Sequence, residues 1–206
     1  MYYAVMERIM SKLQYKKMKR EELIELSQQD DFEALEELIK SIQKNVYTTL
    51  MYLSGNQDKA SDLTQETLLK VAKNIKSLTS PKNFKSWVNH IATNVFYDDT
   101  RKNKKEYQLI SLEDENNRSF FSAIKNFFTD KRCKPPDACI SSELDKIIKY
   151  EILNLPENFR IVIILRELEG LSYEEIALAT NSTIGTVKSR IARARTRLQE
   201  SLKAYV

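Results

Sequence analysis

Residues 172–199 read SYEEIALATNSTIGTVKSRIARARTRLQ, a stretch that predicts two helices joined by a short polar turn. Ser172 and Glu175 have the spacing of a capping box, in which two side chains satisfy the free amides at a helix start. Residues 181–183 form the polar turn, and a second helix is predicted from about residue 184 to residue 203. Two helices joined in this way are a candidate helix-turn-helix.

The second of these helices separates apolar from basic side chains. Residues 184–198 carry five Lys and Arg side chains and no acidic one. The predicted buried stripe consists of Ile184, Val187, Ile191, Ala194, Leu198 and Leu202. At about 100° per residue, four residues fall within about 60° of one another on the opposite face, namely Thr186, Arg190, Arg193 and Arg197. We interpret this as a recognition helix for the major groove; the alternative is a solvated basic face, which would normally include glutamate, as residues 21–37 do.

Upstream, apolar residues at three- and four-residue steps predict three further helices. These helices span about residues 31–54, 58–78 and 84–105. The apolar positions of the first are Phe32, Leu35, Leu38, Ile39, Ile42, Val46, Leu50 and Leu53. Gly55 is expected to stop the first helix and Pro81 to end the second. Three helices over this length predict one compact helical domain.

The third of these helices carries a polar and aromatic stripe beside its apolar face. The residues predicted to face inward are Phe84, Val88, Ile91 and Val95. The stripe consists of Asn83, Trp87, His90, Asn94, Tyr97 and Arg101, and it runs into the basic residues 101–105. Aromatic rings interleaved with cations suit unpaired bases and their phosphates, because every base offers a π-face. Trp87 taken alone is equally consistent with a core residue.

The second helix carries a different patch, in which carboxylates and an amide surround one leucine. Its members share one helix face and are Asp62, Gln65, Glu66 and Leu69. Such a patch suits a docking surface for a basic protein partner. Standing alone, the patch would be interpreted as an ordinary solvated face in preference to a docking surface.

Composition limits the classes of fold and function. The 206 residues include three glycines and four prolines, so the chain is predicted to be all-α, and no GxxxxGK[ST] or GxGxxG phosphate cradle occurs. One histidine and two cysteines, Cys133 and Cys139, argue against a metal site, and we assign no catalytic residue, metal or cofactor. The net charge is +4, and neither a signal peptide nor an 18-residue apolar run occurs, which favours a soluble cytoplasmic protein without membrane insertion.

The predicted elements divide the chain into four parts. The parts are an N-terminal arm or extra helix (1–30), a first helical domain (31–105), an interdomain linker (106–142) and the helix-turn-helix domain (143–206). The linker contains an acidic run at residues 113–115 and the sequence CKPPDAC. In the last domain, Pro156 is expected at the first position of a helix that Gly170 ends.

Two pairs of sequence blocks resemble a known family. GTVKSRIARARTRLQ (185–199), preceded by LPENFRIVIILRELEGLSYEEIA (155–177), resembles the C-terminal domain of bacterial RNA polymerase sigma factors of the extracytoplasmic-function (ECF) group. DLTQETLLKV (62–71) and FKSWVNHIATNVFYDDTRK (84–102) resemble the N-terminal domain of that group. A helix-turn-helix alone is shared by many regulators, whereas both pairs in this order are typical of the ECF group.

The resemblance implies which partner each surface contacts. The first domain would bind the clamp helices of the largest subunit of core RNA polymerase, with Asp62, Gln65, Glu66 and Leu69. It would also capture the unpaired minus-ten strand, with Asn83, Phe84, Trp87, His90, Asn94, Tyr97, Arg101 and Lys102. The second domain would contact the polymerase flap region and read the duplex minus-thirty-five element, with Ser182, Thr183, Thr186, Lys188, Ser189, Arg190, Arg193 and Arg197. The linker would run toward the active centre, where its acidic run either imitates nucleic acid or keeps the linker extended.

The resemblance also implies a protein that acts by binding and catalyses nothing itself. Members of this group often have an anti-sigma factor as a further partner. The alternative function is a stand-alone helix-turn-helix transcription regulator, in which the first domain is a sensor or dimerisation module.

Overall fold

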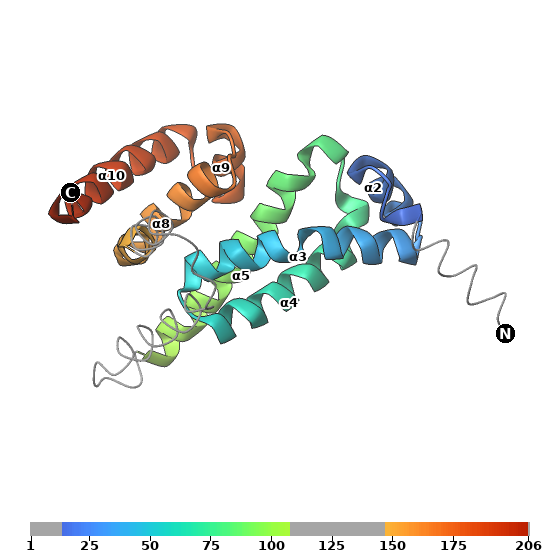
Figure 1. Cartoon of the computed structure of the whole chain (residues 1–206), viewed down its shortest axis with the longest axis horizontal. Coiled ribbons are helices and arrows are strands. Elements are labelled where there is room, and N and C mark those ends of the chain that lie inside the picture. The colour runs from blue at the N-terminus through green and yellow to red at the C-terminus, as the bar shows by residue number, and fades with distance from the viewer. Residues whose placement is uncertain (1–13, 108–146, 206) are drawn as a thin grey trace, which may run out of the picture.

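The computed structural model describes residues 14–107 and 147–205, and every regular element in these ranges is helical (Figure 1). The first range contains α2 (Arg20–Gln28), α3 (Phe32–Ser54), α4 (Gln57–Asn74), η1 (Ile75–Ser77), η2 (Pro81–Asn83) and α5 (Phe84–Tyr107). The second contains a helical stretch at residues 147–154, α8 (Glu157–Ile163), η3 (Ile164–Leu168), α9 (Tyr173–Ala179), α10 (Ile184–Leu202) and η4 (Lys203–Tyr205). The predicted all-α fold is confirmed. Most of the predicted linker, including Cys133 and Cys139, lies outside the described residues.

Local capping sets the ends of the first helices. The carboxylate of Asp31 accepts a hydrogen bond from the Ala34 amide at 3.0 Å and so begins α3. This bond is the main cause of the lowered pKa of Asp31. Gly55 ends α3 in the left-handed conformation, with φ 67°, as predicted. The helix predicted over 58–78 is shorter than expected, because the chain tightens into the 3₁₀ turn η1 after Asn74.

The helix-turn-helix is also built from local caps. The hydroxyl of Ser172 accepts a hydrogen bond from the Glu175 amide at 3.2 Å, and the Glu175 carboxylate accepts one from the Ser172 amide at 2.8 Å. The predicted capping box is therefore confirmed. Pro156 is the N-cap of α8 rather than its first residue, since its ψ of 140° is extended. The sequence predicts one continuous helix after Pro156, but the α-helix α8 gives way to a π-helical turn, η3.

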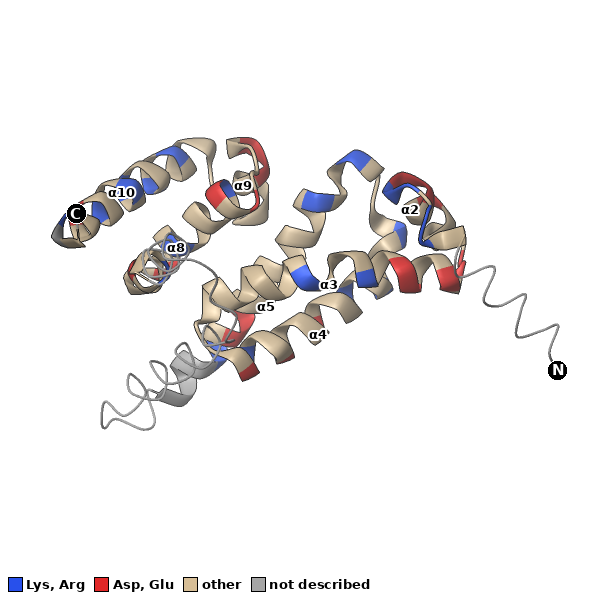
Figure 2. Ribbon diagram, viewed as in Figure 1, with Lys and Arg blue, Asp and Glu red and all other residues tan. Residues whose placement is uncertain are grey.

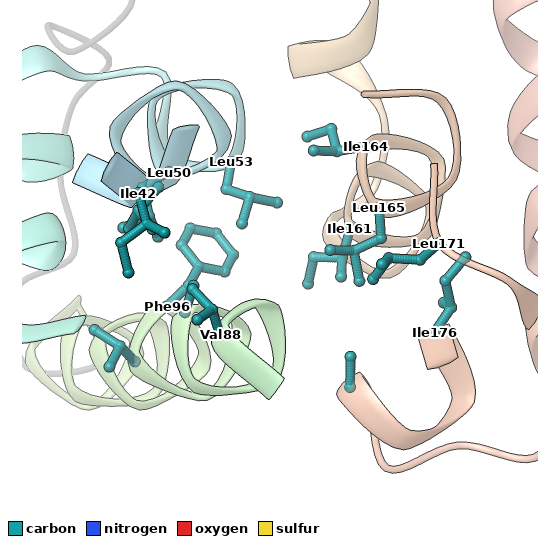
Figure 3. Packing of buried hydrophobic residues seen from close by; sticks show 14 of the residues in the cluster. Ile42, Leu50, Leu53, Val88, Phe96, Ile161, Ile164, Leu165, Leu171 and Ile176 are labelled. Atoms are coloured by element: carbon teal, nitrogen blue, oxygen red, sulfur yellow. The ribbon is translucent and has the colours of Figure 1, made fainter. Parts of the chain in front are cut away.

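Apolar side chains from both parts of the chain form one core. Leu50 and Leu53 of α3 and Phe96 of α5 lie beside Ile161 of α8 and Leu165 of η3 in a single hydrophobic cluster (Figure 3). The predicted helix-turn-helix domain thus packs directly on α3 and α5.

Two residues of the predicted apolar stripes are exposed. Phe32 is 74% exposed and Ile184 is 40% exposed. Each is the first residue of its helix, and helical side chains point toward the N-terminus, so these two extend beyond the packed turns. In the rest of the α10 stripe, Val187, Ile191 and Ala194 are buried, and Leu198 and Leu202 are half-buried.

Candidate nucleic-acid interface

Helix α10 is anchored by its apolar side and exposes a basic one. Because Val187, Ile191 and Ala194 are buried, the opposite side of the helix faces outward. Lys188, Arg193 and Arg197 are exposed there, with Arg190 half-buried, and Figure 2 shows basic residues along the length of the helix. The exposed side of α10 can therefore approach a polyanion along most of its length.

Neighbouring groups hold several of these cations in place. Arg190 donates a hydrogen bond to the Ser182 hydroxyl at 3.1 Å. The guanidinium of Arg197 lies 5.1 Å from the centre of the Phe159 ring, and the ammonium of Lys188 lies 5.9 Å from the Tyr173 ring. Cation–π contacts at these distances orient the charges without neutralising them. The basic side chains therefore keep their charge available for a ligand.

The predicted contact residues at the start of α10 have local structural roles. The Thr183 hydroxyl accepts a hydrogen bond from the Thr186 amide at 3.2 Å and lies 2.9 Å from the Thr186 hydroxyl. Ser189 donates to the Thr186 carbonyl at 2.9 Å and is exposed. These hydroxyls thus define the first turn of the helix that would enter a groove.

The stripe predicted on α5 is accessible along most of its length. Trp87, His90, Asn94 and Tyr97 are half-buried, whereas Asn83, Arg101 and Lys102 are exposed. The Asn94 amide and the His90 ring lie 3.0 Å apart, so both polar groups are held on the same face.

Phe84 differs from the rest of the predicted strand-binding set. It is 2% exposed, so its ring has no surface on which a base could stack. It packs against Trp87, with the ring centres 6.2 Å apart. We therefore assign Phe84 to the support of Trp87 and remove it from the contact set.

The patch predicted on α4 faces solvent. Asp62, Gln65, Glu66 and Leu69 are all exposed, and Leu69 is 60% exposed, a high value for a leucine. Glu66 pairs with Lys70 on the same helix at 2.8 Å. An exposed leucine among carboxylates and an amide is consistent with a protein-docking surface.

Comparison with known proteins assigns the chain to a family. Residues 38–106 match the family described as Sigma-70 region 2, and residues 146–198 match Sigma-70, region 4. The chain is 32% identical over 174 residues to the ECF RNA polymerase sigma factor SigW of Bacillus subtilis. The matched region covers 84% of this chain and 91% of that protein. The chain is 34% identical over 184 residues to the ECF RNA polymerase sigma-E factor of Haemophilus influenzae, covering 88% and 94%. The chain belongs to the ECF RNA polymerase sigma factors.

Solved structures agree with this assignment. The sigma factor RpoE in complex with the anti-sigma factor NepR from Bartonella quintana superposes with a TM-score of 0.61 at 28% identity, covering 82% of this chain and 96% of that one. CnrH in complex with the cytosolic domain of CnrY has the same fold, with a TM-score of 0.59 at 18% identity. In the described ranges of this sigma factor, no helix is both long and apolar enough to span a membrane.

In this sigma factor the two candidate DNA surfaces lie close together. Helix α5 packs against α9, the helix that precedes α10. Burial raises the pKa of Tyr97 on α5, and the positive charge of Arg190 on α10 opposes this rise. The two surfaces are thus neighbours in the described arrangement.

Two polar residues that the sequence does not single out hold this arrangement, the buried Glu169 and the half-buried Arg160. Glu169 accepts hydrogen bonds from the Thr49 hydroxyl at 2.6 Å and from the Asn89 amide at 3.4 Å, and its carboxylate lies 3.5 Å from the Lys85 ammonium. Arg160 donates to the carbonyl of Leu53, at the end of α3. Neither residue stands out in the sequence, since acids and arginines near helix ends usually face water.

Proposed function

We propose that this sigma factor directs core RNA polymerase to promoters through three surfaces. The exposed side of α10 reads the minus-thirty-five element as duplex, the stripe on α5 captures the unpaired minus-ten strand, and the α4 patch binds the polymerase clamp helices. The protein contributes binding energy in the cytoplasm and catalyses no reaction itself. Its membership of the ECF group is the observation that supports this function most directly.

The side-chain chemistry of each DNA surface supports its assignment. Arginine reads guanine edges by paired hydrogen bonds in the major groove, and Arg193 is exposed on the side of α10 away from the core. Unpaired bases stack on aromatic faces, and α5 offers the accessible parts of Trp87 and Tyr97 close to the exposed cations Arg101 and Lys102. A protein that opens DNA at a fixed distance from a duplex site needs both kinds of surface.

The second domain also offers an apolar surface for the polymerase flap. A groove of about 880 Å³ lies between the region around α8 and the end of α10. Its apolar lining includes Ile148, Ile152, Ile164, Leu198 and Leu202. A helix from the flap region would bury its own apolar residues against this lining.

The test is transcription in vitro by core polymerase, with and without the sigma factor, on a library of genomic promoter fragments. Transcripts that start at defined sites only when the protein is present are expected. A stand-alone regulator would instead bind the fragments and start no transcript with core polymerase.

A pair of arginine variants tests the reading surface on a promoter found in this way. Arg193→Ala is expected to weaken duplex minus-thirty-five binding by about 1–3 kcal/mol, as loss of a base-reading arginine does. Arg195→Ala removes the same charge from the other side of the helix, where Arg195 pairs with Glu167 at 2.6 Å, and is the matched control. Equal losses in the two variants would show that α10 contributes only general charge.

A further inference from the structure

The amide of Gln28 joins the N-terminal helix α2 to the end of α4. Its nitrogen donates one hydrogen bond to the Ile75 carbonyl at 3.0 Å and another to the Leu78 carbonyl at 2.8 Å. Ile75 and Leu78 are 3% and 6% exposed, so this tie lies at the edge of the core. The Ile75 carbonyl already accepts a hydrogen bond from the Leu78 amide at 3.2 Å, so Gln28 adds a second donor there and provides one for the Leu78 carbonyl.

These two carbonyls are where the chain leaves α4 for α5. After Leu78 the chain turns at Thr79 and Ser80 into the 3₁₀ turn η2, and it enters α5 at the buried Phe84. Figure 1 shows α2 beside this connection, and α2 contacts both η1 and η2. Between the two anchored ends, Lys82 and Asn83 are exposed. The direction in which they project therefore depends on how firmly Leu78 is held.

We propose that Gln28 is a positioning residue for minus-ten recognition. By fixing the Ile75 and Leu78 carbonyls, it sets the conformation of residues 79–83 and so the place of Asn83 at the head of the α5 stripe. This inference rests on the proposed function of that stripe. It gives α2, which contributes no residue to the three proposed surfaces, a role in sequence selection.

A second tie between the same elements provides a matched control. Lys76 of η1 pairs with Asp30, just after α2, at 2.6 Å. Both side chains are more than half exposed, and exposed ion pairs of this kind contribute little. Asp30 has a positive φ of 68°, a conformation that asparagine also tolerates. Asp30→Asn therefore breaks the ion pair and keeps the backbone, whereas Gln28→Leu removes both donors at similar volume.

The experiment is in vitro transcription from a promoter on which the native protein is active, with the minus-ten and minus-thirty-five segments randomised separately and transcripts sequenced. Gln28→Leu is expected to reduce the base preference at the minus-ten segment by about tenfold and to leave the minus-thirty-five preference unchanged, a loss equal to about 1.4 kcal/mol. Asp30→Asn is expected to keep both preferences. Gln28→Lys restores a donor and is expected to recover most of the minus-ten preference.

Fluorescence of Trp87, the single tryptophan, gives a second readout at the same site. On addition of a fork DNA with an unpaired minus-ten strand, the native protein and Asp30→Asn should show the same emission change, and Gln28→Leu a smaller one. An unchanged minus-ten preference in Gln28→Leu, or equal losses at both promoter segments, would overturn the inference. Failure of the native protein to start transcription would instead remove the proposed function.

Discussion

Replacing Glu169 with alanine separates the two halves of this sigma factor without touching a proposed contact residue. The Glu169 carboxylate lies in the second domain, just after η3, yet its partners Thr49 and Asn89 lie on α3 and α5. The residue is 7% exposed, and Thr49 and Asn89 are 1% and 6% exposed. The substitution therefore removes a buried polar contact between the domains and leaves both partners without it.

The contact distances indicate how large the effect is. The 2.6 Å bond from Thr49 is a short hydrogen bond to a charged group, worth about 1.5–3 kcal/mol. The Asn89 contact at 3.4 Å adds little, because the same side-chain nitrogen also donates to the Lys85 carbonyl at 3.0 Å and keeps that acceptor in the variant. The upper end of this range, about 3 kcal/mol, corresponds to about a 150-fold shift of the equilibrium between packed and separated domains. Lys85 at 3.5 Å is half-exposed and contributes only about 0–1 kcal/mol.

Fluorescence energy transfer between the domains measures this equilibrium. One dye is attached at Lys73 on α4 and the other at Gln199 on α10, both exposed, in a chain whose two native cysteines are replaced by serine. Glu169→Ala is expected to lower the transfer efficiency of the free protein, and Lys85→Met is expected to leave it unchanged. Thr49→Val removes the same hydrogen bond from the other side, so its effect and that of Glu169→Ala should not add in the double variant.

Two results would refute the reasoning. Transfer efficiency in Glu169→Ala equal to that of the native protein would show that the carboxylate does not hold the domains together. Additive effects of Thr49→Val and Glu169→Ala would show that each acts through some other contact. Thermal unfolding of every variant distinguishes domain separation from general loss of structure.

Three further predictions follow from single residues. A Cβ at Gly185 would lie 3.9 Å from its nearest neighbour, so Gly185→Ala should raise stability by about 0.5–1 kcal/mol in thermal unfolding. It should nevertheless weaken duplex binding measured by anisotropy, because the added methyl lies where α10 meets DNA; tighter binding would contradict the reading role. Arg160→Met leaves three carbonyl acceptors unpaired and should lower the free energy of unfolding in urea by about 3 kcal/mol. Trp87→Ala should weaken binding to fork DNA by about 1–3 kcal/mol and leave duplex binding unchanged, so equal losses would rule out base stacking.

Much of the fold follows from local sequence rules. The capping box at Ser172 and the glycine stop at Gly55 appear in the structure where the sequence predicts them. These features depend on a few neighbouring residues, and so they can be read without knowledge of the tertiary fold. The structure departs from the predicted helices where tertiary packing overrides local sequence preference. The π-helical turn η3, which lies against α3, is one such place.

The ties that place the surfaces were not predictable in the same way. Gln28 binds carbonyls 47 and 50 positions along the chain, and Glu169 binds a hydroxyl 120 positions away. In the sequence, Gln28 and Glu169 resemble ordinary surface residues, because the spacing of neighbouring residues does not indicate a partner far along the chain. Phe84 shows the converse. It belongs to both the predicted apolar face and the proposed contact loop, and only its burial in the folded chain decides between the two roles.

The packing of the two domains against each other determines the order in which the protein can bind polymerase and the two promoter elements. The minus-ten and minus-thirty-five elements lie about 25 base pairs apart, or about 85 Å along a duplex, whereas α5 packs directly against α9, the helix before α10. The domains must therefore separate before both elements are bound. The α4 patch is exposed while they are packed, so polymerase can bind there first. Binding to both promoter elements selects the separated state. The apparent affinity of the protein for the promoter therefore falls as the packed fraction of the protein rises. Strengthening the Glu169 contact would lower promoter affinity without altering any base contact.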